Sequence, residues 1–163
     1  MARQWVGSSG TDMDIVIGVG NTLRRDDGLG PFIAGSLPPI PGVITLAVHQ
    51  LTAELTEQLS PVDRVLFIDA SMTDEQIQLK RITERNAPPG HVFAPAALLD
   101  LARVIHGSAP EGWLLSVPGY DFDFGEQLSS QAAVLLPIAK QAVLEWINEG
   151  EEHCSHPSID NVE

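Results

Sequence analysis

Acidic residues follow two apolar runs of this chain. Asp26 and Asp27 come after Asp14–Val19 (DIVIGV), and Asp69 directly follows Val65–Ile68 (VLFI). In open α/β sheets, active sites form beyond the carboxyl ends of the strands, where residues from distant parts of the chain meet. Two carboxylates there could act as acid and base on water, or hold a cation together with a nitrogen donor. The alternative is structural: one acid of the pair caps the next helix, and Asp69 begins a turn.

The elements that would position these acids alternate between strands and helices. A parallel sheet covered by helices on both faces has continuous apolar strands, as this chain does. We therefore predict an α/β fold, a single three-layer α/β/α domain with a mainly parallel twisted sheet of about five strands. The expected strands are Asp14–Val19, Val43–Val48, Val65–Ile68, an edge strand within Gln76–Ile82, and Trp113–Val117. The expected helices are Gly28–Leu37, Thr52–Leu59 with Thr52 as its N-cap, Pro95–Ile105 and Ser129–Asn148.

Composition and charge indicate the domain bounds, the location and the partners to expect. We assign the domain to residues 12–149, a flexible leader to residues 1–11 and a flexible acidic tail to residues 150–163. The net charge of -13 argues against nucleic acid as a partner, because phosphate binding needs a basic surface. Neither a membrane span nor a secretory signal is expected. The single cysteine, Cys154, cannot form an internal disulfide and suits a cytoplasmic location.

A nucleotide-binding function is a weaker hypothesis. The glycines of Gly18-Val19-Gly20 resemble the start of a dinucleotide-binding fingerprint, but Leu23 stands where that fingerprint needs its third glycine. The following pair of aspartates would also repel a pyrophosphate at the helix N-terminus.

The segment from Gly18 to Gly30 (GVGNTLRRDDGLG) resembles the opening motif of the [NiFe]-hydrogenase maturation endopeptidases. That motif has the form Gly-x-Gly-Asn, a spacer, and Asp-(Asp/Glu)-Gly-x-Gly. The resemblance continues through three later segments, which are HQLTAEL from His49, FIDA from Phe67 and HVFAPAALL from His91.

The resemblance implies a catalytic, metal-binding trio of Asp27, Asp69 and His91. It also implies a substrate, a nickel-loaded large-subunit precursor that loses its C-terminal extension. Two carboxylates and an imidazole suit nickel or zinc. The nickel is expected to be the substrate's own, so the resting protein could be metal-free. Residues expected near the substrate are Asn21, Asp26, His49, Gln50 and Thr52.

Two departures from the family pattern bear on these expectations. His49-Gln50-Leu51-Thr52 replaces a common Asp-Gly-Gly-Thr and resembles the branch that serves bidirectional hydrogenases. Gly90 precedes His91, where many members have Ser or Thr. The same trio would equally serve a non-catalytic factor that binds nickel and the precursor. The sequence leaves the activation of water open between a carboxylate base and a metal-polarised carbonyl.

Overall fold

The computed structural model describes residues 12–83 and 94–154 of the 163-residue chain. In this part of the chain, one five-stranded sheet has the strand order β3-β2-β4-β6-β5. The first four of these strands run parallel, and β5 pairs antiparallel with β6 at the edge. The strands are β2 (Asp14–Val19), β3 (Val43–Val48), β4 (Arg64–Ser71), β5 (Gln78–Arg81) and β6 (Glu111–Pro118).

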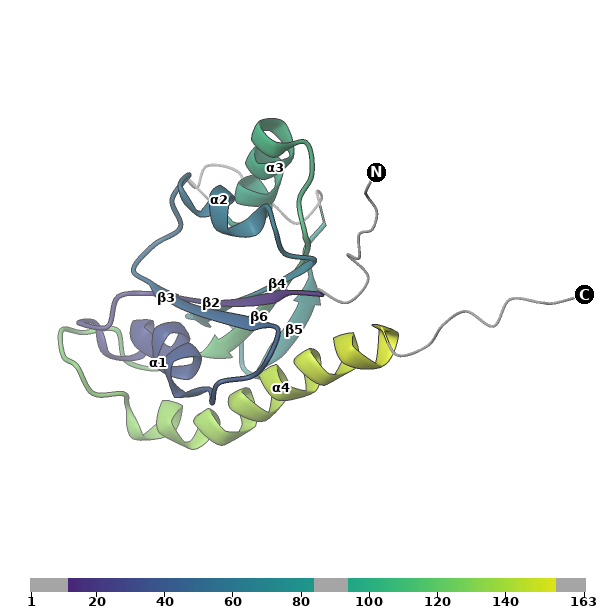
Figure 1. Ribbon diagram of the computed structural model, residues 1–163. Helices are drawn as coiled ribbons and strands as arrows, with labels where there is room; N and C mark the ends of the chain where they lie inside the picture. The colour runs from purple at the N-terminus through teal and green to yellow at the C-terminus, as the bar shows by residue number, and fades with distance from the viewer. Residues whose placement is uncertain (1–11, 84–93, 155–163) are drawn as a thin grey trace, which may run out of the picture.

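Helices cover both faces of the sheet. Figure 1 shows α1 and α4 below the strands and α2 and α3 above them. The helices are α1 (Leu29–Ser36), α2 (Leu55–Leu59), α3 (Pro95–His106) and α4 (Ser130–Cys154), and a 3₁₀ turn, η2 (Arg25–Gly28), precedes α1. This arrangement confirms the predicted three-layer α/β/α fold with a mainly parallel sheet.

The alternation of side chains along β2 explains the two layers of core. Val16 packs with α1 and α4 in one apolar cluster, whereas Ile15 and Ile17 pack with α2 and α3 in the other. All three side chains have no exposed surface. Both faces of a strand in a covered parallel sheet are buried, which is why the run is apolar throughout.

Two glycines of the first motif let α1 pack closely on the sheet. A Cβ atom on Gly18 would lie 2.0 Å from the carbonyl oxygen of Gly30, and one on Gly30 would lie 2.3 Å from the carbonyl oxygen of Ile68. The backbone of α1 therefore lies directly against β2 and β4. This contact holds the loop before α1 at the carboxyl ends of those strands.

Strand β4 is longer than its apolar run indicates. Its pairing with β6 continues past Ile68 through Asp69, Ala70 and Ser71. Asp69 is therefore inside the strand, and the structural alternative in which it begins a turn is wrong.

Two helix predictions also need correction. Helix α2 begins at Leu55 with Glu54 at its N-cap position and no side-chain cap, so Thr52 does not cap it. Helix α4 continues past Asn148 to Cys154. The first residues of the range predicted to be a flexible tail, 150–163, are therefore helical. Among the described residues, no helix is both long and apolar enough to cross a membrane.

Candidate active site

A cleft of about 810 Å³ lies at the carboxyl ends of β2, β3 and β4. Loops after these strands form its walls together with the starts of α2 and α3. Its lining residues are Val19, Gly20, Asp27, His49, Gln50, Leu51, Thr52, Ala53, Glu54, Phe67, Asp69, Ala94, Pro95 and Leu114.

The cleft contains most of the residues singled out from the sequence. Asp27 comes from the turn before α1, Asp69 from β4, and His49, Gln50 and Thr52 from the segment after β3. His91 lies outside the described residues, so its place in the trio stays a prediction. Within residues 12–83 and 94–154, no group of three His, Cys, Asp or Glu side chains could hold a metal ion.

Asp27 is positioned by Asn21. The backbone N–H of Asn21 donates to Oδ2 of Asp27 at 2.8 Å. The side-chain oxygen of Asn21 accepts the N–H of Leu23 at 2.9 Å, which fixes the turn between them. Asn21 does not line the cleft, so its structural role is to shape the loop that carries Asp27.

Asp69 has an unusual ionisation equilibrium. Burial raises its pKa from 3.8 to about 6; the backbone N–H of Ala70 opposes this shift, and the negative charge of Asp27 adds to it. Such a carboxyl group is partly ionised near neutral pH and suits general base catalysis. A cation bound beside both acids would relieve their repulsion, so this pair fits a metal-binding role.

Asp26, predicted to lie near the substrate, has a structural role in the fold. It has no exposed surface and does not line the cleft. Its carboxylate accepts the backbone N–H groups of Tyr120, Asp121 and Ser129 and the hydroxyl of Ser129, at 2.7 to 3.0 Å. Asp26 thus joins the first motif to the loop before α4, and it does not cap α1, whose N-cap position is Gly28.

These hydrogen bonds also set the charge of Asp26. Burial alone would raise its pKa, but the Ser129 hydroxyl and the three N–H groups outweigh burial and lower it below 3.8. The group is therefore a buried, ionised carboxylate that accepts four hydrogen bonds.

Glu54 is a cleft residue that the sequence analysis missed. It adds a third carboxylate to the lining, on the exposed entrance to α2. Its own backbone N–H and the hydroxyl of Thr52 lower its pKa. Its position in the segment between β3 and α2, next to residues already singled out, was the available signal.

The fold and the paired carboxylates place the protein among α/β proteins with a site at the carboxyl ends of a parallel sheet. No family model matches the chain, and no curated protein is significantly similar to it in sequence. Solved structures do match. The hydrogenase maturating endopeptidase HybD from E. coli has a TM-score of 0.70 at 21% identity, over 85% of this chain and 93% of that chain.

Two archaeal structures give similar values. The [NiFe] hydrogenase maturation protease HycI from Thermococcus kodakarensis has a TM-score of 0.63 at 19% identity, over 84% of this chain and 90% of that chain. The hydrogenase 2 maturation peptidase from a Thaumarchaeota archaeon has a TM-score of 0.61 at 22% identity, over 84% and 99%. The chain therefore has the fold found in hydrogenase maturation endopeptidases.

Proposed function

We propose that this protein is an endopeptidase that removes the C-terminal extension of a nickel-loaded [NiFe]-hydrogenase large-subunit precursor. The main support is the meeting of Asp27 and Asp69 in one open cleft, in the fold that proteins named as maturation endopeptidases share. The segment from His49 to Thr52 lines the same cleft, and its sequence favours a precursor of the bidirectional type. We place this activity in the cytoplasm.

In this proposal the nickel belongs to the substrate. Asp27, Asp69 and His91 would bind it, because carboxylate oxygen and imidazole nitrogen are ligands that nickel accepts. The two described carboxylates share a cleft, and the charge of Asp27 raises the pKa of Asp69. With a nickel-free precursor, the negative charges of Asp27 and Asp69 in the cleft would have no cation between them, so we expect this precursor to be cut poorly.

The raised pKa of Asp69 supports a carboxylate as the base. Peptide hydrolysis needs a water proton removed as the oxygen adds to the scissile carbonyl, and a proton supplied to the departing amine. Asp69, whose pKa is about 6 in the metal-free cleft, can take this proton on the carboxylate oxygen that does not bind nickel and return it to the amine. We assign this proton transfer to Asp69.

The nucleotide-binding alternative is disfavoured by the loop after β2. In a phosphate-binding loop, backbone N–H groups point at the phosphates. Here the N–H of Asn21 donates to the carboxylate of Asp27, which would also repel a phosphate.

The test is an intact-mass measurement on precursor incubated with the purified protein, using nickel-loaded and nickel-free forms. Only the loaded precursor should lose a C-terminal peptide. Asp69→Asn should abolish this loss, and the matched variant Asp100→Asn, an exposed acid of α3 outside the cleft, should not.

Each other outcome has a definite meaning. Stable binding of loaded precursor without any cleavage would favour the non-catalytic binding factor. Normal cleavage by Asp69→Asn would show that the assigned site is wrong.

A further inference from the structure

Two loops from distant parts of the chain join beside the cleft. The N–H of Gly125 donates to the carbonyl oxygen of Leu23, and the N–H of Arg25 donates to the carbonyl oxygen of Gly125, both at 2.8 Å. Arg24 and Gly125 thereby form a short β-bridge. The loop before η2 and the loop before α4 therefore form one continuous surface.

This surface presents large apolar side chains to solvent. Phe124 is 86% exposed and Leu23 is 58% exposed. The guanidinium of Arg24 lies 5.7 Å from the centroid of the Phe124 ring, and its Nε donates to the carbonyl oxygen of Phe122 at 3.2 Å. Among the described residues Arg24 forms no ion pair, unlike Arg25, which pairs with Asp121 at 3.1 Å.

The surface is also held in a fixed shape. The buried carboxylate of Asp26 ties the two loops together through its four hydrogen bonds. Arg25 adopts a φ of 44°, a conformation that is costly for a residue other than glycine and persists only where the surroundings enforce it. A preorganised surface loses little conformational entropy when a partner binds it.

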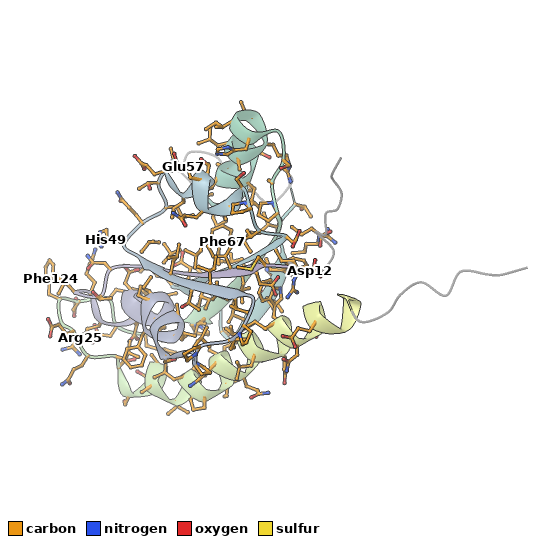
Figure 2. The ribbon with its side chains drawn as sticks, viewed as in Figure 1. Asp12, Arg25, His49, Glu57, Phe67 and Phe124 are labelled. Atoms are coloured by element: carbon orange, nitrogen blue, oxygen red, sulfur yellow. The ribbon has the colours of Figure 1, made fainter. Side chains whose placement is uncertain are left out.

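Its position connects it to the cleft. Asp27, which lines the cleft, belongs to the same turn as Arg24 and Arg25. Figure 2 shows Phe124 and Arg25 at the same end of the molecule as His49, which lines the cleft after β3. A protein substrate that enters the cleft would therefore extend over this surface.

We propose that Leu23, Arg24 and Phe124 form a docking surface for the substrate protein. The partner segment is apolar, covers Leu23 and the Phe124 ring, and offers a carboxylate to Arg24. Aromatic side chains, phenylalanine included, and arginine are enriched at the cores of protein interfaces, and arginine is among the residues that most often dominate their binding energy. The identity of the partner, a hydrogenase large-subunit precursor, rests on the proposed function.

The experiment measures binding and cleavage separately. Labelled nickel-loaded precursor is mixed with the protein, the Kd is read by stopped-flow anisotropy before cleavage, and kcat and KM follow from the processed mass. The double variant Leu23→Ser, Phe124→Ser should raise Kd and KM about tenfold, because truncating interface anchors removes binding energy. Arg24→Glu should raise both by a similar factor. Val104→Ser, a matched change at a side chain that is 82% exposed on α3, should leave them unaltered.

The outcomes separate this inference from the proposed function. If the wild type cleaves and both docking variants bind and cleave normally, the docking surface is wrong and the peptidase assignment stands. If the wild type binds without cleaving, the peptidase assignment fails, and the Kd values of the variants still decide the docking surface. If the wild type does not bind the precursor at all, both fail. Should the double variant lose its native melting transition, Arg24→Glu alone decides.

Discussion

At the residue scale, the adjacent acids Asp26 and Asp27 show that different surroundings give two identical side chains different roles. Asp27 faces the cleft with one oxygen held by the Asn21 N–H, whereas Asp26 points away and is fully buried. The sequence could predict an acid near the carboxyl end of β2, because both aspartates come shortly after the apolar run that forms this strand. The sequence could not predict the structural role of Asp26, because the hydrogen-bond partner Tyr120 is 94 positions away along the chain.

Asp69→Asn is predicted to stabilise the protein. The folded pKa of Asp69, about 6, lies above its ordinary value of 3.8, so folding favours the protonated form. Stability from this group is present below about pH 4 and is lost as the pH rises through 6, by about 2 to 3 kcal/mol in all. Asparagine avoids the buried charge. The melting temperature of the variant should exceed that of the wild type at pH 7.5, and the difference should shrink to near zero at pH 4.

Identical melting of the two proteins at every pH would contradict the raised pKa. Asp100→Asn is the control, because Asp100 is exposed on the surface of α3. Its effect on melting should be small across the same range.

Asp26→Asn is predicted to destabilise the protein by about 1 to 3 kcal/mol. Asparagine has the same shape, but its NH₂ group must face one of the donors that now point at the carboxylate, which leaves a buried donor unpaired. Because the folded pKa of Asp26 is lowered, its contribution is present above pH 3.8 and is lost as the pH falls below it.

Urea unfolding at pH 7 tests this prediction. Asp123→Asn, an exposed acid in the same loop, is the matched control and should change the free energy of unfolding by less than about 0.5 kcal/mol. Equal stability of the two variants would show that the Asp26 hydrogen bonds contribute little.

At the element scale, the apolar runs of the sequence predicted where the strands lie, but they did not predict strand ends that are polar. The polar residue Asp69 ends the apolar run, yet Asp69, Ala70 and Ser71 belong to β4 because β6 continues alongside them as far as Pro118. Thr52 was placed as a cap from residue type alone, and the helix begins only at Leu55 because Thr52, Ala53 and Glu54 form turns before it. Strand partners and turn geometry are properties of the folded chain, so a single segment cannot reveal them.

The close contact of α1 with the sheet gives a prediction at this scale. Gly30→Ala should destabilise the protein by about 3 kcal/mol or more, because its Cβ would meet backbone oxygens of Ile68 and Val19 at 2.3 and 2.6 Å. Neither oxygen can move without shifting a central strand.

Gly35→Ala in the same helix is the matched control. A Cβ there meets nothing within 4 Å, and alanine is the better helix former by roughly 0.5 to 1 kcal/mol. Thermal melting should therefore show a loss of stability for Gly30→Ala and no loss for Gly35→Ala. Similar behaviour of the two variants would mean that α1 can move away from the sheet at little cost.

At the scale of the whole molecule, the two ends of the sheet are built differently. The carboxyl end holds the open cleft, whose acids Asp27, Asp69 and Glu54 form no ion pair within the part of the chain that the structure describes. The amino end holds a second cavity of about 510 Å³, lined by the ion pairs of Arg64 with Asp14 and of Arg81 with Glu111. There Arg64 of β4 pairs with Asp14 of β2, and its guanidinium lies 4.0 Å from the Trp146 ring of α4. The Arg64 Nη1 also donates to the carbonyl oxygen of Trp146 at 3.1 Å. One side chain thus joins two strands to the longest helix, far from the candidate site.

Removing this junction should cost stability without affecting the cleft. In Arg64→Met the carboxylate of Asp14, whose side chain is only 13% exposed, loses its partner, and the free energy of unfolding should fall by about 3 kcal/mol or more. Adding Asp14→Asn should recover part of that loss, because the buried charge is gone.

The matched control is Arg103→Met. Arg103 pairs with Asp100 at 2.7 Å, but both side chains are at least 50% exposed, so the loss of this pair should cost less than about 1 kcal/mol. Urea unfolding of the wild type, Arg64→Met, Asp14→Asn and the double variant measures the coupling between Arg64 and Asp14 directly. If Arg64→Met and Arg103→Met cost the same, the buried pair does not hold α4 on the sheet, and apolar packing of α4 alone must do so.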